Sequence, residues 1–139
     1  MNVLGLDHVV LRVADVDKSI SWYERVLKGR VERTLPELGL YQIRIGAALV
    51  DLVPIDSKLG RAGGGAVQPN GRNLDHFAVQ LAEFDKKELH AHLESAGVTP
   101  TNVERRYGAQ GYGPSMYLED PDGNVVELKG PPDDDQSAA

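Results

Sequence analysis

The chain has 139 residues, of which 41% are hydrophobic and 26% are charged, the balance of one ordinary globular domain. It contains no cysteine, which excludes disulfide frameworks, cysteine-ligated metal sites and thiol nucleophiles. Its net charge of −6 argues against nucleic-acid partners, and no apolar run approaches the ~20 residues of a membrane-spanning helix.

The chain opens on an apolar, β-branched run over residues 5–13, which predicts a strand. The N-terminal segment MNVLGLDHVVLRVADVDKS lacks the basic start, apolar run and cleavage site of a secretory signal, so we expect a cytoplasmic protein. Asp15 or Asp17 then offers a helix N-cap, and apolar residues recur at helical spacing up to Gly29. Three further strands are predicted over residues 30–34, 38–46 and 47–54.

A glycine-rich stretch, residues 55–73, follows this first set of elements. We interpret it as a linker, with a mobile lid as the alternative, because loops of this length are either functional or flexible. The sequence then starts again: LDHFAVQLAEFDK, residues 74–86, matches LDHVVLRVADVDK, residues 6–18, at six of thirteen positions.

The second copy predicts the same order of elements as the first. A strand over residues 74–81 leads to a helix capped by Asp85 and ended by Gly97. Strands are predicted over residues 100–106, 114–119 and 124–130, with the turn Pro121-Asp122-Gly123-Asn124 before the last. The expected fold is therefore α+β, with two βαβββ modules over residues 5–54 and 74–130 of one domain, residues 1–130. The acidic tail, residues 131–139, is expected to be disordered.

The repeat brings chemically useful side chains to equivalent positions. His8 and His76 stand in matching strands, and Asp51 and Glu127 match when Leu49–Leu52 is aligned with Val125–Leu128. A polar residue inside a buried strand is costly unless it is paired or bound. Two imidazoles and two carboxylates suit Fe, Ni, Zn, Mn or Co, so a divalent-metal site is favoured. The alternative is that both histidines are ordinary core residues that donate to nearby carbonyls.

The sequence resembles the vicinal oxygen chelate superfamily, which includes glyoxalases, bleomycin-resistance proteins, extradiol dioxygenases and fosfomycin-resistance transferases. The resemblance covers residues 5–130 and rests on LDHVVLRVADVDKSISWYERVL, LDHFAVQL and MYLEDPDGNVVEL. It implies that the modules' sheets form a cup around a metal ion. His8, His76 and Glu127 match three metal ligands. Asp51 matches a fourth position that is glutamate in glyoxalases, and Asp is one methylene shorter.

The resemblance also implies what the chain does. The first hypothesis is a metal-dependent lyase or isomerase acting on a small substrate that chelates the metal through two oxygens. Glu127 and Asp51 would move protons, and Tyr117 is a hydrogen-bond donor candidate near the metal. No further organic cofactor is expected.

Three other functions remain open at this point. One is an Fe(II) extradiol dioxygenase, although a second-shell histidine base is missing. Another is a metal-free protein that binds drugs or aromatic compounds. The last is methyl or thiol transfer to an antibiotic epoxide, although the potassium-loop residues of that subgroup are not evident in GYGPSMYLEDPDG.

The resemblance further implies a homodimer, since modules in this superfamily pair within a chain or are exchanged between chains. In the exchanged form, His8 and Asp51 of one subunit would meet His76 and Glu127 of the other. The long linker is compatible with either arrangement.

Overall fold

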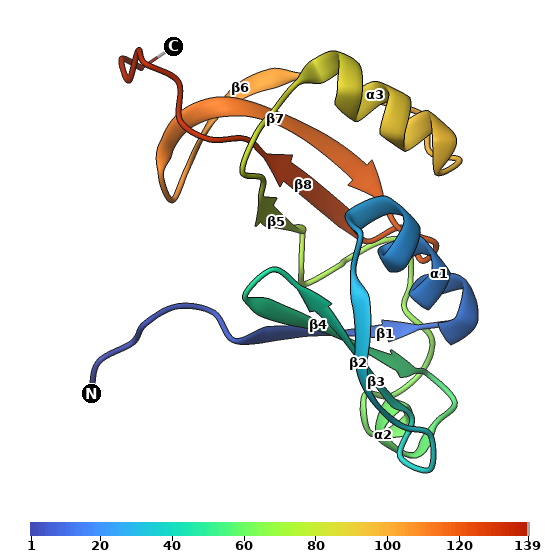
Figure 1. Ribbon diagram of the computed structural model, residues 1–139. Helices are drawn as coiled ribbons and strands as arrows, with labels where there is room; N and C mark the ends of the chain where they lie inside the picture. Colours follow the sequence, from blue (N-terminus) through green and yellow to red (C-terminus); the bar gives the residue numbers. More distant parts are fainter. Residues whose placement is uncertain (139) are drawn as a thin grey trace. The chain divides into compact units, whose positions relative to one another are not determined.

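The computed structural model describes residues 1–138, which divide into two compact units, Met1–Arg72 and the chain from Asn73 onward. Each unit is built on its own four-stranded mixed sheet (Figure 1). Among residues 1–138, no helix has the length and apolar character needed to cross a lipid bilayer.

The first unit contains a βαβββ module followed by a short helix. The elements are β1 (His8–Val13), α1 (Val16–Leu27), β2 (Arg30–Leu35), β3 (Leu40–Ile45), β4 (Ala48–Pro54) and α2 (Lys58–Ala62). The strand order is β1-β4-β3-β2, so the first and last strands of the module are neighbours. That pair is parallel and the other two pairs are antiparallel.

The second unit repeats this topology. Its elements are β5 (His76–Gln80), α3 (Lys86–Ser95), β6 (Glu104–Gly108), β7 (Gly111–Glu119) and β8 (Val125–Lys129). The order β5-β8-β7-β6, with a parallel β5–β8 pair, is the order of the first sheet. The α+β class and the two βαβββ modules predicted from the repeat are confirmed.

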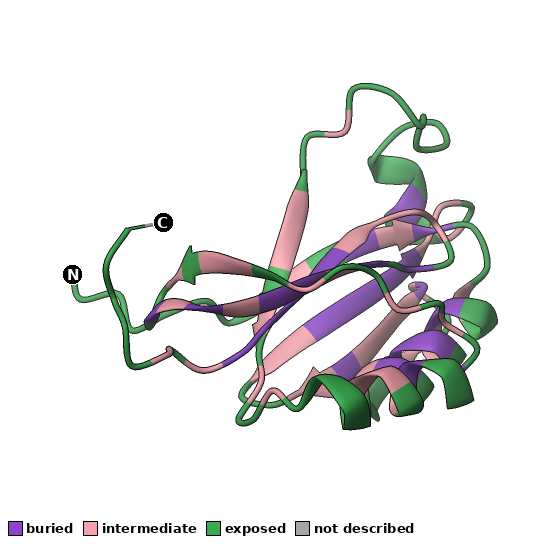
Figure 2. Ribbon diagram, turned by 90° about the horizontal axis from the view of Figure 1, so that it is seen from above, coloured by how far each residue is buried: buried purple, intermediate pink, exposed green. Residues whose placement is uncertain are grey.

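Alternation along the central strands sends successive side chains to opposite faces of each sheet. In β4, Val50 and Leu52 are buried in the core, and Asp51 between them faces the other side. In β8, Val126 and Leu128 are buried and Glu127 faces the other side. Buried residues accordingly lie along the strands and on one side of the helices (Figure 2). Asp51 and Glu127 therefore take equivalent positions in the two sheets, each on the face opposite to these buried residues.

The longer helices, α1 and α3, begin after the aspartates that the sequence indicates as N-caps. Asp15 accepts a hydrogen bond from the backbone N–H of Lys18, and Asp85 accepts one from that of Glu88. The first helix ends at Leu27, two residues before the expected glycine, because its C-cap residue Lys28 takes the left-handed conformation with φ 54°. Gly29 is needed for packing instead: a Cβ there would lie 2.6 Å from Ile45 Cδ1.

We expect Asp15→Ala and Asp85→Ala each to lower the free energy of unfolding by about 1 kcal/mol, the usual value of an N-cap side chain. Urea denaturation followed by circular dichroism measures both changes. Asp17→Ala is the control, because Asp17 lies in the first turn of α1 and only favours the helix dipole. An equal loss in the Asp17 variant would contradict the assignment of the cap.

The stretch between the modules has more structure than a flexible linker. It contains α2, whose five residues are too few to show a helical pattern in the sequence. Arg12 of β1 donates to the carbonyl oxygens of Gly60, Gly63 and Gly64 at 3.1, 3.0 and 2.6 Å. These contacts attach the start of the glycine-rich stretch to the first sheet.

The acidic tail, expected to be disordered, makes specific contacts over its described part. Arg105 of β6 pairs with Asp133 at 2.7 Å and also donates to the carbonyl oxygens of Asp135 and Ser137. Gln136 bonds both backbone groups of Tyr112 in β7. Composition alone could not indicate this, because the partners of the tail lie about 25–30 residues earlier in the chain.

Candidate functional site

The polar face of the second sheet brings together His76, Glu127 and Tyr117. Glu127 of β8 lies opposite Tyr117 of β7 on one side and Ala78 of β5 on the other. His76 is two residues before Ala78 and therefore lies on the same face. The His76 and Tyr117 rings meet edge to face, with centroids 5.2 Å apart. Three residues that the sequence nominated separately are thus neighbours.

Glu127 has an unusual environment for a carboxylate. It is buried, and its Oε1 has no hydrogen-bond partner. Its Oε2 lies 3.4 Å from Nε2 of His76, longer than the roughly 2.7–3.2 Å of ordinary N–H···O hydrogen bonds. A buried carboxylate with one oxygen unpartnered is costly, so it is a feature that requires an explanation.

Tyr117 lies between His76 and an arginine that the sequence analysis missed. The Arg106 guanidinium stacks 4.4 Å from the centre of the Tyr117 ring. Arg106 also donates to Ser115 Oγ and pairs with Glu104, each at 2.7 Å. The sequence could have indicated this pair, because Glu104 and Arg106 are two residues apart on a strand and therefore lie on the same face.

The first sheet carries a comparable group of polar side chains, with different residues. His8 and Asp51 lie on one face, because Val10, two residues after His8, is the register partner of Asp51. Gln42 of β3 lies opposite Asp51, as Tyr117 lies opposite Glu127. Its Nε2 donates to both carboxylate oxygens of Asp51, at 3.2 and 3.1 Å. Asp51 is therefore buried but satisfied. The sequence alone did not indicate a role for Gln42, because its contact with Asp51 depends on how β3 and β4 are paired.

Each histidine is hydrogen-bonded to the aspartate directly before it. His8 Nδ1 lies 2.6 Å from Asp7 Oδ1, and His76 Nδ1 lies 2.6 Å from Asp75 Oδ2. The bond to Asp7 is the main cause that raises the pKa of His8, and the charges of Asp51 and Asp7 act in the same direction. The repeat displays Asp7 and Asp75 as identical positions, although the sequence assigns them no function.

The donor chemistry of both faces fits a divalent metal. Each module supplies one imidazole and one carboxylate, and such nitrogen and oxygen donors suit the borderline divalent metals. Within the part of the chain that the structure describes, no three His, Asp or Glu side chains gather into a complete cluster. Glu127, with a free oxygen, fits a ligand better than Asp51, whose two oxygens are held by Gln42.

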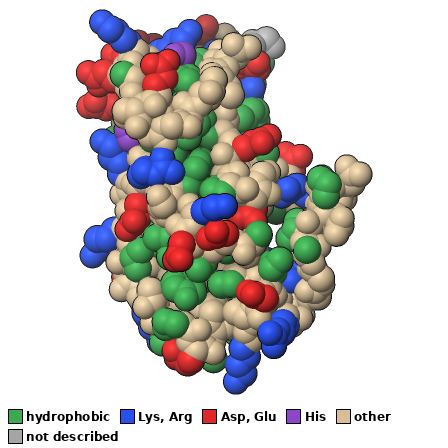
Figure 3. Space-filling model, turned by 90° about the vertical axis from the view of Figure 1, so that its right-hand side faces the viewer, with side chains coloured by type: hydrophobic (Ala, Val, Ile, Leu, Met, Phe, Trp, Pro, Cys, Tyr) green, Lys and Arg blue, Asp and Glu red, His purple; other side chains and the backbone are tan. Residues whose placement is uncertain are grey.

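Arginines near these faces are engaged within the protein. Arg44 forms a two-point ion pair with Glu32, at 2.6 and 2.9 Å, and this pair lowers the pKa of Glu32. Arg12 holds the glycine-rich stretch, as described above. Acidic and basic side chains are interspersed over the surface seen in Figure 3, with no large region of one sign.

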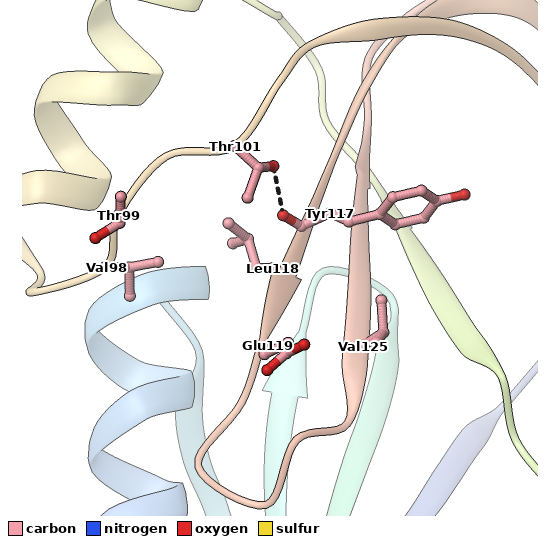
Figure 4. Close-up of a pocket in the computed structure, with 7 residues that line it drawn as sticks. All are labelled: Val98, Thr99, Thr101, Tyr117, Leu118, Glu119 and Val125. Carbon is pink, nitrogen blue, oxygen red and sulfur yellow. Dashed lines mark hydrogen bonds between the residues drawn. The ribbon is translucent and has the colours of Figure 1, made fainter. Parts of the chain in front are cut away.

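A pocket of about 490 Å³ lies in the second unit beside β7. Its lining comes from the segment after α3 and from β7 and β8: Val98, Thr99, Thr101, Tyr117, Leu118, Glu119 and Val125. Figure 4 shows the Tyr117 ring pointing away from the other labelled side chains, while its carbonyl accepts a hydrogen bond from Thr101. His76 and Glu127 are not among the residues that line this pocket.

Several known proteins are similar to this chain in sequence. It is 31% identical over 124 residues to the glutathione transferase FosA of Serratia marcescens, covering 89% of this chain and 79% of that relative. It is 28% identical over 133 residues to the glyoxalase domain-containing protein RDO1 of Mycosarcoma maydis, covering 92% and 69%.

Solved structures share the fold. The integron cassette protein VCH_CASS1 from the mobile metagenome of V. cholerae matches with a TM-score of 0.69 and 28% identity, over 94% of this chain and 97% of that one. The fosfomycin resistance protein FosX of Listeria monocytogenes, 20% identical over 93% and 94% of the two chains, has a TM-score of 0.66. The family model of the glyoxalase/bleomycin resistance protein/dioxygenase superfamily matches residues 5–128. The chain belongs to that superfamily.

Proposed function

We propose that the protein is a divalent-metal-dependent enzyme acting on a small molecule that binds through two oxygens. His8, His76 and Glu127 would hold the metal, drawn from the two modules of one chain or of two chains in a homodimer. A divalent ion there would polarise the oxygens of a bound substrate. The observation that carries the proposal is the pair formed by His76 Nε2 and the buried Glu127 carboxylate.

The hydrogen-bonding capacity of the two side chains explains why this pair favours a bound metal ion. An ionised carboxylate only accepts hydrogen bonds, so the ring nitrogen of His76 that meets Asp75 must be the donor. In the neutral ring, Nε2 is then an acceptor as well, and it faces another acceptor, Glu127 Oε2, at 3.4 Å. Two facing acceptors repel unless a cation lies between them. A divalent ion would provide that charge and would use the free Oε1 of Glu127.

The remaining polar groups have roles in the reaction under this proposal. Asp51, fixed by Gln42 Nε2, would accept a proton from the substrate at one of its carboxylate oxygens. Tyr117, fixed by Arg106 and by the His76 ring, would donate a hydrogen bond to a substrate oxygen. A lyase or isomerase reaction is the first hypothesis. A dioxygenase and a metal-free binding protein are the alternatives.

Glutathione transfer is a second candidate, favoured by the 31% identity to the Serratia marcescens glutathione transferase. In such a step with an epoxide, the thiol sulfur bonds to a ring carbon, the carbon–oxygen bond breaks, and the thiol proton ends on that oxygen. The chain has no cysteine, so the thiol would come from the co-substrate. Loss of free glutathione in the presence of fosfomycin and each divalent ion tests this candidate.

Elemental analysis of protein purified without chelators tests the metal proposal. We expect about one Fe, Ni, Zn, Mn or Co per site in the wild type, and a loss of metal in His8→Ala and in Glu127→Ala. Glu37→Ala is the matched control, because Glu37 is exposed in the turn between β2 and β3. Wild-type protein that takes up none of these ions after incubation would overturn the proposal and leave a metal-free binding protein.

A further inference from the structure

We infer that Asp7 and Asp75 are positioning residues, which fix the proton on Nδ1 of the neighbouring histidine and leave Nε2 free to bind a metal. The inference rests on the proposed function for the use of Nε2. The orientation of each ring, however, can be observed without any metal. Neither aspartate had been a candidate site residue.

The direction of each hydrogen bond follows from the chemistry of the two groups. A carboxylate has no proton to donate at neutral pH, so the contact of 2.6 Å requires a proton on Nδ1. Charge-assisted hydrogen bonds of this length are stronger than neutral ones. In a neutral imidazole, the lone pair is then confined to Nε2. For His76, that nitrogen faces Glu127 Oε2.

The same geometry occurs twice, in modules that share no strand. Both pairs follow a leucine in the repeated segment Leu-Asp-His, and only the residue before that segment differs, Gly5 in the first copy and Asn73 in the second. Even so, both pairs have the same distance and the same ring nitrogen. The repeated Leu-Asp-His segment therefore makes the same side-chain contact in both modules.

A purely structural role does not account for these contacts. The Asp7 and Asp75 side chains are 90% and 95% exposed, and exposed ion pairs contribute little to folding because water competes for both partners. The backbone of Asp7 is fixed separately, since its carbonyl accepts a hydrogen bond from Leu49 N–H in β4. The side chain is thus left to orient the ring. Carboxylates that fix metal-ligating histidines in this way change metal affinity by about 10–100-fold.

The first test observes the rings in metal-free protein. Nitrogen-15 NMR at a pH well above the ordinary imidazole range, where both rings are neutral, distinguishes protonated from unprotonated ring nitrogens. We expect His8 and His76 to be protonated on Nδ1 in the wild type. In Asp7→Ala the proton of His8 should move to Nε2, the commoner neutral form, while His76 stays unchanged. Asp75→Ala should show the reverse.

The second test measures affinity for Ni²⁺ and Zn²⁺ by competition with a chelating dye. We expect Asp7→Ala and Asp75→Ala each to bind roughly 10–100-fold more weakly than the wild type, with an unchanged midpoint of urea unfolding. Asp7→Asn should recover much of the loss, because its side-chain carbonyl still accepts from Nδ1–H. Asp56→Ala is the control for the lost charge, since Asp56 is an exposed residue before α2.

The two tests separate this inference from the proposed function. If the wild type binds no metal but the rings change as expected, the proposed function fails and the positioning role stands. If metal binds and the alanine variants keep both the wild-type affinity and protonation on Nδ1, the positioning role is wrong. Equal weakening by Asp56→Ala would also overturn it, because the loss would then reflect only the net charge.

Discussion

Replacing Glu127 with glutamine is expected to abolish metal binding and, at the same time, to stabilise the metal-free protein. The carboxylate is buried, its Oε1 has no partner, and its Oε2 faces the acceptor nitrogen of His76. A glutamine of nearly the same shape removes the buried charge and can donate its amide hydrogen to His76 Nε2. We expect a gain of about 1–2 kcal/mol in the free energy of unfolding without metal.

Urea unfolding with and without metal measures both effects. At a metal concentration a hundredfold above Kd, the wild type should gain about 2.7 kcal/mol, whereas Glu127→Gln should gain nothing. Glu119→Gln on β7 is the control, because Glu119 is exposed and belongs to the pocket that His76 does not line. A metal-free Glu127→Gln protein less stable than the wild type would contradict this prediction and show that the carboxylate is favourably paired in the folded state.

Replacing Asp120 with alanine is expected to cost about 2–4 kcal/mol of stability, since several hydrogen bonds are lost together. The buried carboxylate accepts hydrogen bonds from the backbone N–H groups of Asp122 and Asn124, at 2.9 and 2.8 Å, and from the Asn124 side chain at 2.9 Å. These bonds close the turn between β7 and β8, where Gly123 takes φ 76°. Alanine would leave the three donors without their acceptor.

The same variant should weaken metal binding without removing a ligand. The turn fixes the register that sets Glu119 opposite Val125 and Tyr117 opposite Glu127, so a loosened turn moves Glu127 relative to its neighbours. Asp120→Asn is the matched comparison: it keeps one accepting oxygen and places an amide group near the Asn124 amide, and we expect an intermediate loss. Urea midpoints and Ni²⁺ affinities measure the series. Full stability in Asp120→Ala would show that the turn closes without this side chain.

Much of the fold could be predicted because the internal sequence repeat indicates that the same order of strands and helix occurs twice. The match between residues 6–18 and 74–86 places two strands and two helix starts at once, and Asp15 and Asp85 cap the helices as expected. The turn at Gly123 is also where its sequence indicates. Signals of this kind lie within a few residues of one another, so local sequence suffices to detect them.

The parts that the sequence did not predict depend on contacts between distant residues. The guanidinium of Arg12, for example, meets carbonyls of Gly60, Gly63 and Gly64, about fifty residues later in the chain. Gln42 and Arg106 gain their roles only from strand pairing, which sets each beside a candidate site residue. The sequence did nominate His8, His76, Asp51, Glu127 and Tyr117, and the structure places them in two groups, one on each sheet.

The pairing of the first and last strands within each module has a consequence for the order of folding. The parallel pair of strands at one edge of each sheet joins residues far apart in sequence, such as His8 with Leu49 and His76 with Val125. A sheet therefore cannot close until its last strand has left the ribosome. All four strands of the first sheet precede residue 55, so that sheet has every partner it needs before β5 is synthesised. We therefore expect the modules to fold one after the other during translation.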